Sequence, residues 1–582
     1  MLYPDMYKEL EDLLGPENIT QEPCVMDSYA WQPLWNNSGE MWTPRAEAVV
    51  LPASAQECQK IVQLCNQYGV RFKAIATGWG STGACCGENT IQIDLRRMDK
   101  IIEIDEKNMY AVIEPYVCGN QFQAELMKRG LNCHIISAGA GASPLASATS
   151  MMGCAPDGLS MGWSSRNLLG VEWVQPSGEL IQVGSPGSGL GWWTAEGPGP
   201  GLRGIFRGRF GGHGGNGVFT KCALKVYPYA GPPKPEIQGF LMDTLCPIPK
   251  NCKLIVQVFK DRDAMARATG AIAEEGIGQQ SMKDGIGSAL CIMLPNMVRT
   301  QAWVKSKALK EMMSAFNFTF LWILMCHSSE ELDFQESVMK HEAHKVGGMH
   351  FDAGTGPFAQ MYFWTMVDNA IYPFAMRGGG MMFTGYSNDD SHYVACESSA
   401  DTVAIKKKWI EKGTCLDDNG DATCHFFCEE NLQSHCEEPW LFDPRIKRHR
   451  EGVEMMERDL LAMWIERCQE QAGVLMPQCR KLLSSMEGNF NEYVKGLMGK
   501  IDPNRVADTF TYADEEDLSW ERMDPELMNV EELKAKLNRL IPERTWTGRP
   551  EPLEPAAPAT KAKTVQEEAA RPLTARAGLD AV

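Results

Sequence analysis

Four glycines and a Ser-Thr pair are concentrated in one short loop at residues 75–87. The loop reads Ile-Ala-Thr-Gly-Trp-Gly-Ser-Thr-Gly-Ala-Cys-Cys-Gly. Its glycines tolerate positive φ and allow another group to approach the backbone closely. Consecutive N–H groups in such a turn form an anion-binding nest, and Ser81 and Thr82 add hydroxyl donors. The loop is predicted to bind the pyrophosphate of a dinucleotide; the alternative is a glycine-rich surface turn.

A second stretch, residues 137–153, is rich in small residues along its whole length. It reads Ser-Ala-Gly-Ala-Gly-Ala-Ser-Pro-Leu-Ala-Ser-Ala-Thr-Ser-Met-Met-Gly. Small side chains let a backbone lie against a flat ligand or against another backbone. The composition therefore suits contact with a ligand, and the alternative is a structural cluster of turns.

The elements around the first loop are predicted to be mostly strands. Ser54-x-x-Glu57 is a capping box, apolar residues follow it at helical spacing as far as Tyr68, and Gly69 suits the position after a helix end. No helix opens on the glycines, so the arrangement is not that of a Rossmann fold. The strands predicted before and after the loop are residues 48–51, 70–76, 91–95, 101–104 and 110–114.

Composition and charge exclude several classes of protein. The chain has 582 residues, which predicts two or more domains. Its formal net charge of -19 argues against nucleic acid and against an anionic membrane surface as partners. The longest apolar run, residues 316–326, is too short to cross a bilayer, and no N-terminal targeting signal is visible. The 20 cysteines show no secreted-type framework, so reduced thiols and a cytoplasmic location are expected.

A proline-rich segment at residues 231–235 reads as a linker between two parts of the chain. A predicted strand at 254–259 and a helix at 261–275 open a second α+β region after the linker. From residue 549 the chain is rich in Pro, Ala, Glu and Lys, a composition typical of disorder. The predicted parts are an N-terminal segment at 1–43, a first domain at 44–229, a second domain at 236–440, a helical C-terminal part at 441–548 and a disordered tail at 549–582.

Several motifs occur in an order that resembles one known family. They are Leu51-Pro-Ala-Ser54, Gly78–Gly83, Glu114-Pro115, residues 139–153, Gly162-Trp-Ser-Ser-Arg-Asn-Leu-Leu-Gly170 and Gly217-Val-Phe-Thr220. Residues 44–228 resemble the FAD-binding domain of the vanillyl-alcohol oxidase/p-cresol methylhydroxylase superfamily, which includes glycolate oxidase and D-lactate dehydrogenase flavin subunits. Residues 254–276 are similar to the start of its substrate cap. Residues 495–504 look like the C-terminal segment that returns to the flavin domain.

The resemblance implies an α+β fold: a two-part FAD-binding domain of the p-cresol methylhydroxylase type with an α+β substrate cap domain. Covalent members often carry a tethering histidine in the glycine loop, where this chain has Gly80-Ser81-Thr82, so non-covalent FAD is expected. The implied cofactor-binding residues are Thr77, Gly78, Trp79, Gly80, Ser81, Thr82, Gly83, Gly139, Ala142, Ser143, Ser147, Thr149, Ser150, Gly153, Gly217 and Val218.

The family places its substrate between cap and flavin, so catalytic side chains are expected in the cap domain. Tyr386 and His392 are candidates for a general base or an orienting hydrogen-bond donor. Arg377 is a candidate to hold a carboxylate or phosphate through two hydrogen bonds. The alternatives are a surface tyrosine, a hydrogen-bonded core histidine and a solvated arginine.

A group of potential soft metal ligands lies near the end of the second domain: Cys415, Cys424, His425, Cys428, His435 and Cys436. Such a density could hold zinc or an iron–sulfur cluster. However, the spacing contains no Cys-x-x-Cys pair, and an acidic turn at 417–421 separates the first two cysteines. We predict a hairpin with reduced thiols near its ends and no metal at these four cysteines.

Together these features predict an FAD-dependent dehydrogenase that oxidises a small alcohol, phenolic or hydroxy-acid substrate by hydride transfer to FAD. The thiol-rich composition favours electron transfer to a partner protein, such as an iron–sulfur protein, instead of oxygen. An oligomer without a nucleic-acid partner or a transmembrane segment is expected. Two alternatives stay open: a redox-neutral FAD transferase like the alkyl-dihydroxyacetone-phosphate synthases, and a flavin electron-transfer subunit docked on iron–sulfur partners.

Overall fold

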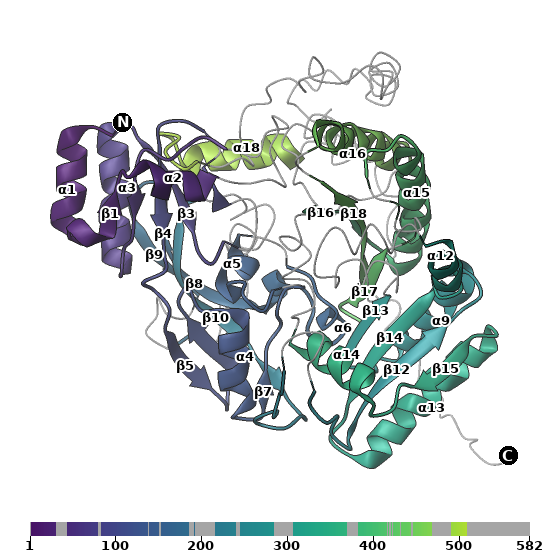
Figure 1. The fold of residues 1–582 in the computed structure, drawn as a ribbon. Coiled ribbons are helices and arrows are strands. Elements are labelled where there is room, and N and C mark those ends of the chain that lie inside the picture. The colour runs from purple at the N-terminus through teal and green to yellow at the C-terminus, as the bar shows by residue number, and fades with distance from the viewer. Residues whose placement is uncertain are drawn as a thin grey trace, which may run out of the picture. The chain divides into compact units, whose positions relative to one another are not determined.

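In a computed structural model, the described residues form β-sheets of four, five and seven strands and a smaller two-stranded sheet of β7 and β11 (Figure 1). Helices accompany the three larger sheets, which confirms the predicted α+β class. The structure describes residues 2–30, 43–78, 83–85, 87–137, 139–150, 153–184, 191–192, 216–239, 245–283, 306–368, 382–415, 417, 421, 423–430, 432–443, 446–467 and 490–508.

The four-stranded sheet has the order β1-β2-β4-β3, and both β2 and β3 run parallel to β4. Helix α3 connects β2 to β3, so β4 lies between the two strands of the predicted β–α–β unit. The elements of this part are α1 (Pro4–Leu14), η1 (Pro16–Asn18), β1 (Ile19–Thr20), α2 (Pro23–Ala30), β2 (Val49–Val50), α3 (Ala55–Tyr68), β3 (Arg71–Ile75) and β4 (Thr90–Asp94).

Helix α3 begins and ends where its sequence predicts. The Ser54 Oγ accepts a hydrogen bond from the Glu57 N–H at 3.2 Å. The Glu57 carboxylate accepts from the N–H of Ala53 at 2.7 Å, one residue before the usual capping-box partner. At the other end, Gly69 is left-handed with φ 65°, and its N–H donates to the carbonyl of Cys65. These local interactions fix the point at which β3 starts toward the glycine loop.

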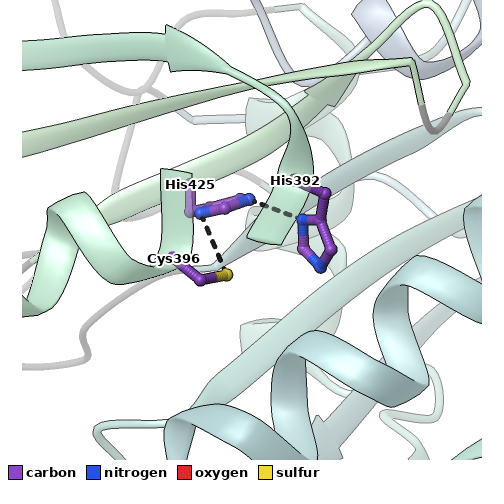
Figure 2. A group of neighbouring side chains, drawn as sticks. All are labelled: His392, Cys396 and His425. Carbon is purple, nitrogen blue, oxygen red and sulfur yellow. Dashed lines mark hydrogen bonds between the residues drawn. The ribbon is translucent and has the colours of Figure 1, made fainter. Parts of the chain in front are cut away.

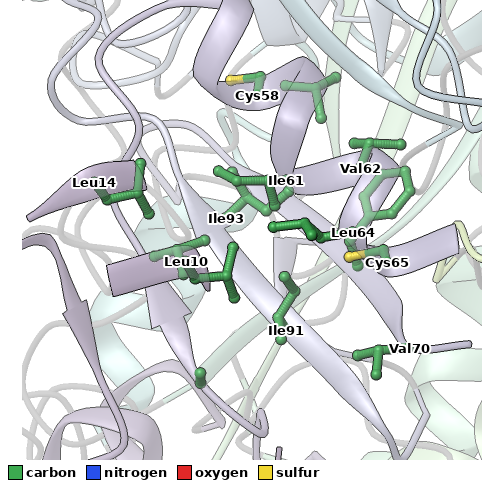
Figure 3. Close-up of a cluster of buried hydrophobic side chains, with 14 of the residues drawn as sticks. Leu10, Leu14, Cys58, Ile61, Val62, Leu64, Cys65, Val70, Ile91 and Ile93 are labelled. Carbon is green, nitrogen blue, oxygen red and sulfur yellow. The ribbon is translucent and has the colours of Figure 1, made fainter. Parts of the chain in front are cut away.

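A cluster of buried apolar side chains joins α1 and α3 to the four-stranded sheet (Figure 3). Ile61 and Leu64 of α3 and Ile91 and Ile93 of β4 have no exposed surface. Burying each such side chain contributes roughly 1.5–3 kcal/mol relative to leaving it exposed. This core therefore holds the strand that leads into the glycine loop.

The five-stranded sheet is antiparallel throughout, with the order β5-β6-β10-β8-β9. Strand β10 lies at its centre and comes from residues more than a hundred positions after β6, as the predicted closing strand requires. The elements of this part are β5 (Ile101–Asp105), β6 (Tyr110–Ile113), α4 (Gly119–Met127), β7 (Leu131–Asn132), α5 (Pro144–Thr149), α6 (Gly158–Met161), η3 (Ser164–Asn167), β8 (Leu168–Val174), β9 (Leu180–Val183), β10 (Val218–Lys225) and β11 (Tyr227–Pro228).

The seven-stranded antiparallel sheet belongs to the predicted cap and has the order β15-β12-β14-β13-β17-β18-β16. Strands β17 and β18 form a hairpin, as predicted for the cysteine-rich segment. The strands are β12 (Cys252–Val258), β13 (Gln280–Lys283), β14 (Thr319–Met325), β15 (Met349–Asp352), β16 (Met382–Asp390), β17 (Cys424–Cys428) and β18 (Gln433–Phe442).

The helices of the second half begin with α9, whose N-cap Asp261 accepts from the Ala264 N–H at 2.8 Å. None of the helices in the described parts of the chain is long and apolar enough to cross a membrane. The helices are α9 (Arg262–Glu274), α12 (Lys307–Ser314), α13 (Ser329–Lys345), α14 (Pro357–Val367), α15 (His392–Glu411), α16 (Lys447–Arg467) and α18 (Phe490–Ile501).

The segment after α18 returns to the four-stranded sheet. The Phe72 N–H donates to the carbonyl of Val506 at 2.8 Å, and the Asp508 N–H donates to the carbonyl of Phe72 at 2.9 Å. The buried Lys73 ammonium donates to the Asp508 carbonyl at 3.0 Å, and Arg71 forms an ion pair with the Asp508 carboxylate. Residues 506–508 therefore extend the edge of β3, next to the glycine loop.

Candidate cofactor and substrate site

Within the glycine loop, the structure describes residues 75–78 at one end and residues 83–85 and 87 at the other. Gly78, which is half-buried like Thr77, has a φ of 70°, the left-handed conformation that an anion nest uses. Gly83 is not left-handed; a Cβ there would lie 3.0 Å from the Ile75 side chain, so glycine permits close packing. Gln92 Nε2 donates to the Gly83 carbonyl at 3.0 Å and ties the loop to β4. Four predicted cofactor-binding residues lie outside the described residues: Trp79, Gly80, Ser81 and Thr82.

The N-terminus of α4 holds the small-residue segment in place. The Gly119 N–H donates to the carbonyl of Ala142 and the Asn120 N–H to that of Ala140, both at 2.8 Å. A Cβ on Gly119 would lie 2.9 Å from the carbonyl oxygen of Gly139, so the two backbones are in direct contact. These two N–H groups, which a helix leaves without a helical partner, are used within the protein and are not open to a phosphate.

Gly153 is closely surrounded by other side chains and leaves no room for a larger residue. A Cβ there would lie 2.1 Å from the Ser147 Oγ, 2.3 Å from the Ser164 Oγ and 3.1 Å from Ile136. The Ser147 and Ser164 hydroxyls form a hydrogen bond with each other at 2.6 Å, and both side chains are buried. The backbone at Gly153 therefore lies directly on a hydroxyl pair, which connects the predicted cofactor segment to η3.

The other predicted hydroxyls of this segment have partners inside the protein. Ser143 accepts from the Ala146 N–H at 3.1 Å and so caps α5. Thr149 donates to the carbonyl of Leu145 at 2.9 Å and lies 3.2 Å from the Ser150 hydroxyl. Ser150 is the most accessible of these hydroxyls, since it is half-buried and the others are buried. Their contacts with a cofactor stay predictions.

Gly217 directly precedes Val218, the first residue of the closing strand β10. Gly217 has a φ of 96°, and a Cβ there would lie 2.4 Å from both the Trp173 Nε1 and the Val174 carbonyl. The same indole donates to the carbonyl of Asn216 at 2.8 Å. The close approach of β10 to β8 is sufficient to explain the glycine at this position. Contact between Gly217 and the cofactor stays a prediction.

A buried His–Asp pair, not predicted from the sequence, supports the segment at Gly153. The His134 Nδ1 lies 2.6 Å from an Asp157 carboxylate oxygen, and its Nε2 lies 3.3 Å from the Gly153 carbonyl. The second Asp157 oxygen accepts from the Ile135 N–H at 3.2 Å. This pair ties both ends of the small-residue segment together. The only sequence signal was a histidine close before the segment and an aspartate close after it.

Of the three predicted catalytic residues, the structure describes the side chain of one. Arg377 lies outside the described residues, and Tyr386 is placed on β16 by its backbone alone. His392, the first residue of α15, is 1% exposed. Its Nε2 lies 2.9 Å from the Ala266 carbonyl, which can only accept, so this nitrogen carries the proton. The geometry thus favours the alternative of a hydrogen-bonded core histidine, and a catalytic role for His392 stays a prediction.

The electrostatics around His392 keep the imidazole neutral. Burial lowers the pKa of His392 to about 4. Burial also lowers the pKa of His425, whose Nε2 lies 3.1 Å from the His392 Nδ1. Asp421, predicted to lie in a turn, forms buried ion pairs with Arg262 at 2.9 Å and Lys283 at 3.2 Å. The buried polar side chains at these positions of the cap therefore have hydrogen-bond or ion-pair partners within the protein.

Comparison with known proteins agrees with this architecture. Residues 46–184 match a family model described as an FAD binding domain. The glycolate oxidase subunit GlcD of Bacillus subtilis is 23% identical over 243 residues, covering 42% of this chain and 48% of that protein. Alkyldihydroxyacetonephosphate synthase of Dictyostelium discoideum is 28% identical over 138 residues, covering 22% of this chain and 23% of that protein. The chain thus spans less than half the length of these two relatives.

A solved structure extends the likeness beyond the first domain. The crystal structure of p-cresol methylhydroxylase with substrate bound aligns with a TM-score of 0.68 at 17% identity, covering 88% of this chain and 97% of that chain. At this identity the alignment shows the fold. The chain therefore carries an FAD-binding domain and has the fold of the p-cresol methylhydroxylase-type flavoproteins, as its motifs predicted.

The described residues fit FAD. Gly78 has the backbone conformation of an anion nest, and glycine at 153 lets the small-residue segment pack directly on Ser147 and Ser164. The residues that would hold the cofactor are those at 77–83 and 139–153, within the matched domain. When bound, FAD supplies an acceptor for a hydride or for electrons.

Proposed function

We propose that the protein is an FAD-dependent oxidoreductase that oxidises a small alcohol, phenolic or hydroxy-acid substrate. The observation that carries the proposal is the match of residues 46–184 to an FAD binding domain. Phenols are the first substrates to test, because the p-cresol methylhydroxylase fold covers 88% of this chain. The subunit status of GlcD supports a partner protein as the electron acceptor, and we expect the protein to act as an oligomer in the cytoplasm.

The roles of the chain's own residues follow from their chemistry. The segments at 77–83 and 139–153 bind the cofactor through backbone groups and small side chains. In this proposal Tyr386 removes or orients the substrate proton, and Arg377 holds an anionic substrate group. His392 instead stabilises the cap, since its Nε2–H is held by Ala266.

The deciding experiment is anaerobic reduction of the bound flavin by p-cresol, benzyl alcohol and glycolate, followed by absorbance. At least one of these classes should bleach the flavin. In the Tyr386→Phe variant the reduction rate should fall by ~10²–10⁴-fold, as expected for loss of a general base, while dithionite reduces both proteins equally. Equal substrate rates in both proteins would remove Tyr386 from the mechanism, and no reduction by any substrate would remove the dehydrogenase proposal.

FAD is expected to be non-covalent, because the glycine loop lacks a histidine and the described His134 has both ring nitrogens engaged. Acid precipitation should leave the yellow chromophore in the supernatant with the mass of FAD. Flavin that stays with the precipitated chain would contradict this prediction. Recovery of FMN would instead contradict the assignment of the cofactor.

A redox-neutral transferase is the second candidate, favoured by the match to alkyldihydroxyacetonephosphate synthase. Such an enzyme returns its flavin to the starting oxidation state, so a turnover assay would show no consumption of an electron acceptor. For each two-electron oxidation of substrate, a dehydrogenase consumes one equivalent of a two-electron acceptor or two equivalents of a one-electron acceptor. A flavin electron-transfer subunit, the third candidate, would be reduced by a partner protein and by none of the substrates.

A further inference from the structure

Two histidines and a cysteine meet inside the cap domain. His392 and Cys396 lie one turn apart on α15 and so share a helix face. His425 projects toward them from β17 (Figure 2). One potential ligand atom from each residue lies within 4.8 Å of the other two. All three are buried, with 1%, 4% and 1% exposure, respectively.

The hydrogen bonds around His392 prepare it as a ligand. Because its Nε2–H is held by the Ala266 carbonyl at 2.9 Å, its Nδ1 presents a lone pair, which lies 3.1 Å from the His425 Nε2 and 3.2 Å from the Ser434 hydroxyl. Metal-ligating histidines usually donate their other N–H to a carbonyl or carboxylate in this way, which fixes both tautomer and ring orientation. The Ala266 carbonyl is therefore an outer-shell partner already in place.

A second thiol, that of Cys436, lies on the neighbouring strand, outside the group of three whose potential ligand atoms all lie within 4.8 Å of one another. Cys436 is the partner of His425 in the β17–β18 ladder. Directly opposed residues in a ladder project from the same face of the sheet, so Cys436 lies on the side of α15. It is also buried, at 3% exposure. The set is thus two imidazoles and two thiols, drawn from one helix and two strands.

The distances are close to those of a tetrahedral ion. Zinc bonds of about 2.0–2.1 Å to nitrogen and about 2.3 Å to sulfur place neighbouring nitrogens about 3.3 Å apart and nitrogen and sulfur about 3.6 Å apart. The His392 Nδ1 and His425 Nε2 are 3.1 Å apart, and the His425 Nδ1 and Cys396 Sγ are 3.9 Å apart. These contacts use opposite nitrogens of His425, and one ion can bond to only one of them, so metal binding requires the His425 ring or one of its two neighbours to reorient.

We propose that His392, Cys396, His425 and Cys436 bind one zinc ion that stabilises the cap. The Cys₂His₂ donor set is typical of closed structural zinc sites, and the burial of all four residues leaves no open position for substrate. Each thiol loses its proton to solvent as its sulfur bonds to zinc, so two thiolates balance the charge of Zn²⁺. The sequence predicted no metal at Cys415, Cys424, Cys428 and Cys436, and of these four cysteines the proposed zinc site includes only Cys436.

The test uses the full-length, FAD-loaded protein, stripped with a chelator and titrated with Co²⁺ as a spectroscopic substitute for Zn²⁺. The wild type should bind one equivalent with a thiolate-to-cobalt charge-transfer band, and zinc should displace the cobalt. Cys396→Ser should weaken binding by more than the roughly 10- to 100-fold that loss of an outer-shell partner costs. Cys424→Ser is the matched control, because residue 424 precedes His425 on β17 and faces the opposite side of the strand.

Two outcomes would overturn the proposal. One is a folded wild-type protein with bound flavin that takes up no stoichiometric cobalt or zinc. The other is equal cobalt binding, with the same charge-transfer band, in the wild type and in Cys396→Ser. If Cys396→Ser fails to fold, cobalt titrations of the wild type and of a His425→Gln variant test the proposal in the same way.

Discussion

Replacing Lys406 with Met is expected to lower the free energy of unfolding of the cap by ~3–5 kcal/mol. The Lys406 ammonium lies 2.7 Å from a Glu438 carboxylate oxygen, and neither side chain has exposed surface. The other carboxylate oxygen accepts from the Thr423 hydroxyl. The substitution leaves a buried carboxylate facing an apolar side chain, and desolvation of that charge is the source of the loss.

The measurement is thermal unfolding of the flavin-loaded protein, in which the melting temperature should fall by roughly 6–20 °C at roughly 2–4 °C per kcal/mol. Lys408→Met is the matched control, because Lys408 lies on the same helix but is half exposed and forms a surface pair with Asp459. Such pairs contribute ~0–1 kcal/mol, so little change is expected. The Lys406→Met/Glu438→Leu double variant should recover most of the stability. Equal stability of the two single variants would contradict the prediction.

Replacing Gly153 with Val is expected to weaken FAD binding by roughly 10- to 100-fold. The first added carbon would lie 2.1 Å from the Ser147 Oγ and 2.3 Å from the Ser164 Oγ, so the segment or its supporting serines must move. Overpacking of this kind costs ~1–3 kcal/mol, and a tenfold loss of affinity corresponds to ~1.4 kcal/mol. The strain falls on the backbone that is predicted to line the cofactor.

The affinity is measured by titrating FAD into the deflavinated protein and following flavin fluorescence. Gly356→Val serves as the control, because no atom lies within 4 Å of a Cβ at that exposed position, which belongs to neither predicted cofactor segment. Circular dichroism should show that both variants are folded. Wild-type affinity in Gly153→Val would place the cofactor away from the segment at 139–153.

Features that depend on neighbouring residues were predictable from the sequence. The capping box at Ser54 and the left-handed Gly69 specify both ends of α3 through contacts within a few residues. The β17–β18 hairpin was predicted in the same way, since its two strands are close in the sequence. The order of glycine motifs was sufficient to identify the FAD-binding fold, because backbone approach to a dinucleotide restricts which residues fit.

Features that depend on distant pairings were not predictable. The sequence places His392 about thirty residues before His425, and only the packing of α15 on β17 brings them to 3.1 Å. For the same reason the sequence grouped His425 with nearby cysteines and omitted Cys396. The His134–Asp157 pair was also missed, because neither residue belongs to a motif and their 2.6 Å contact requires the intervening segment to fold back.

The segment at 506–508 that completes the edge of β3 has a consequence for synthesis on the ribosome. The Lys73 ammonium donates to the carbonyl of Asp508, which lies 435 residues later in the chain. Translation at ~5–20 residues per second leaves that edge exposed in the nascent chain for roughly 20–90 seconds. During this time the buried Lys73 site and the strand edge beside the glycine loop lack their final neighbours. In the nascent chain this strand edge is therefore open to pairing with other strands, and stable cofactor capture is expected only after residues 506–508 have been synthesised.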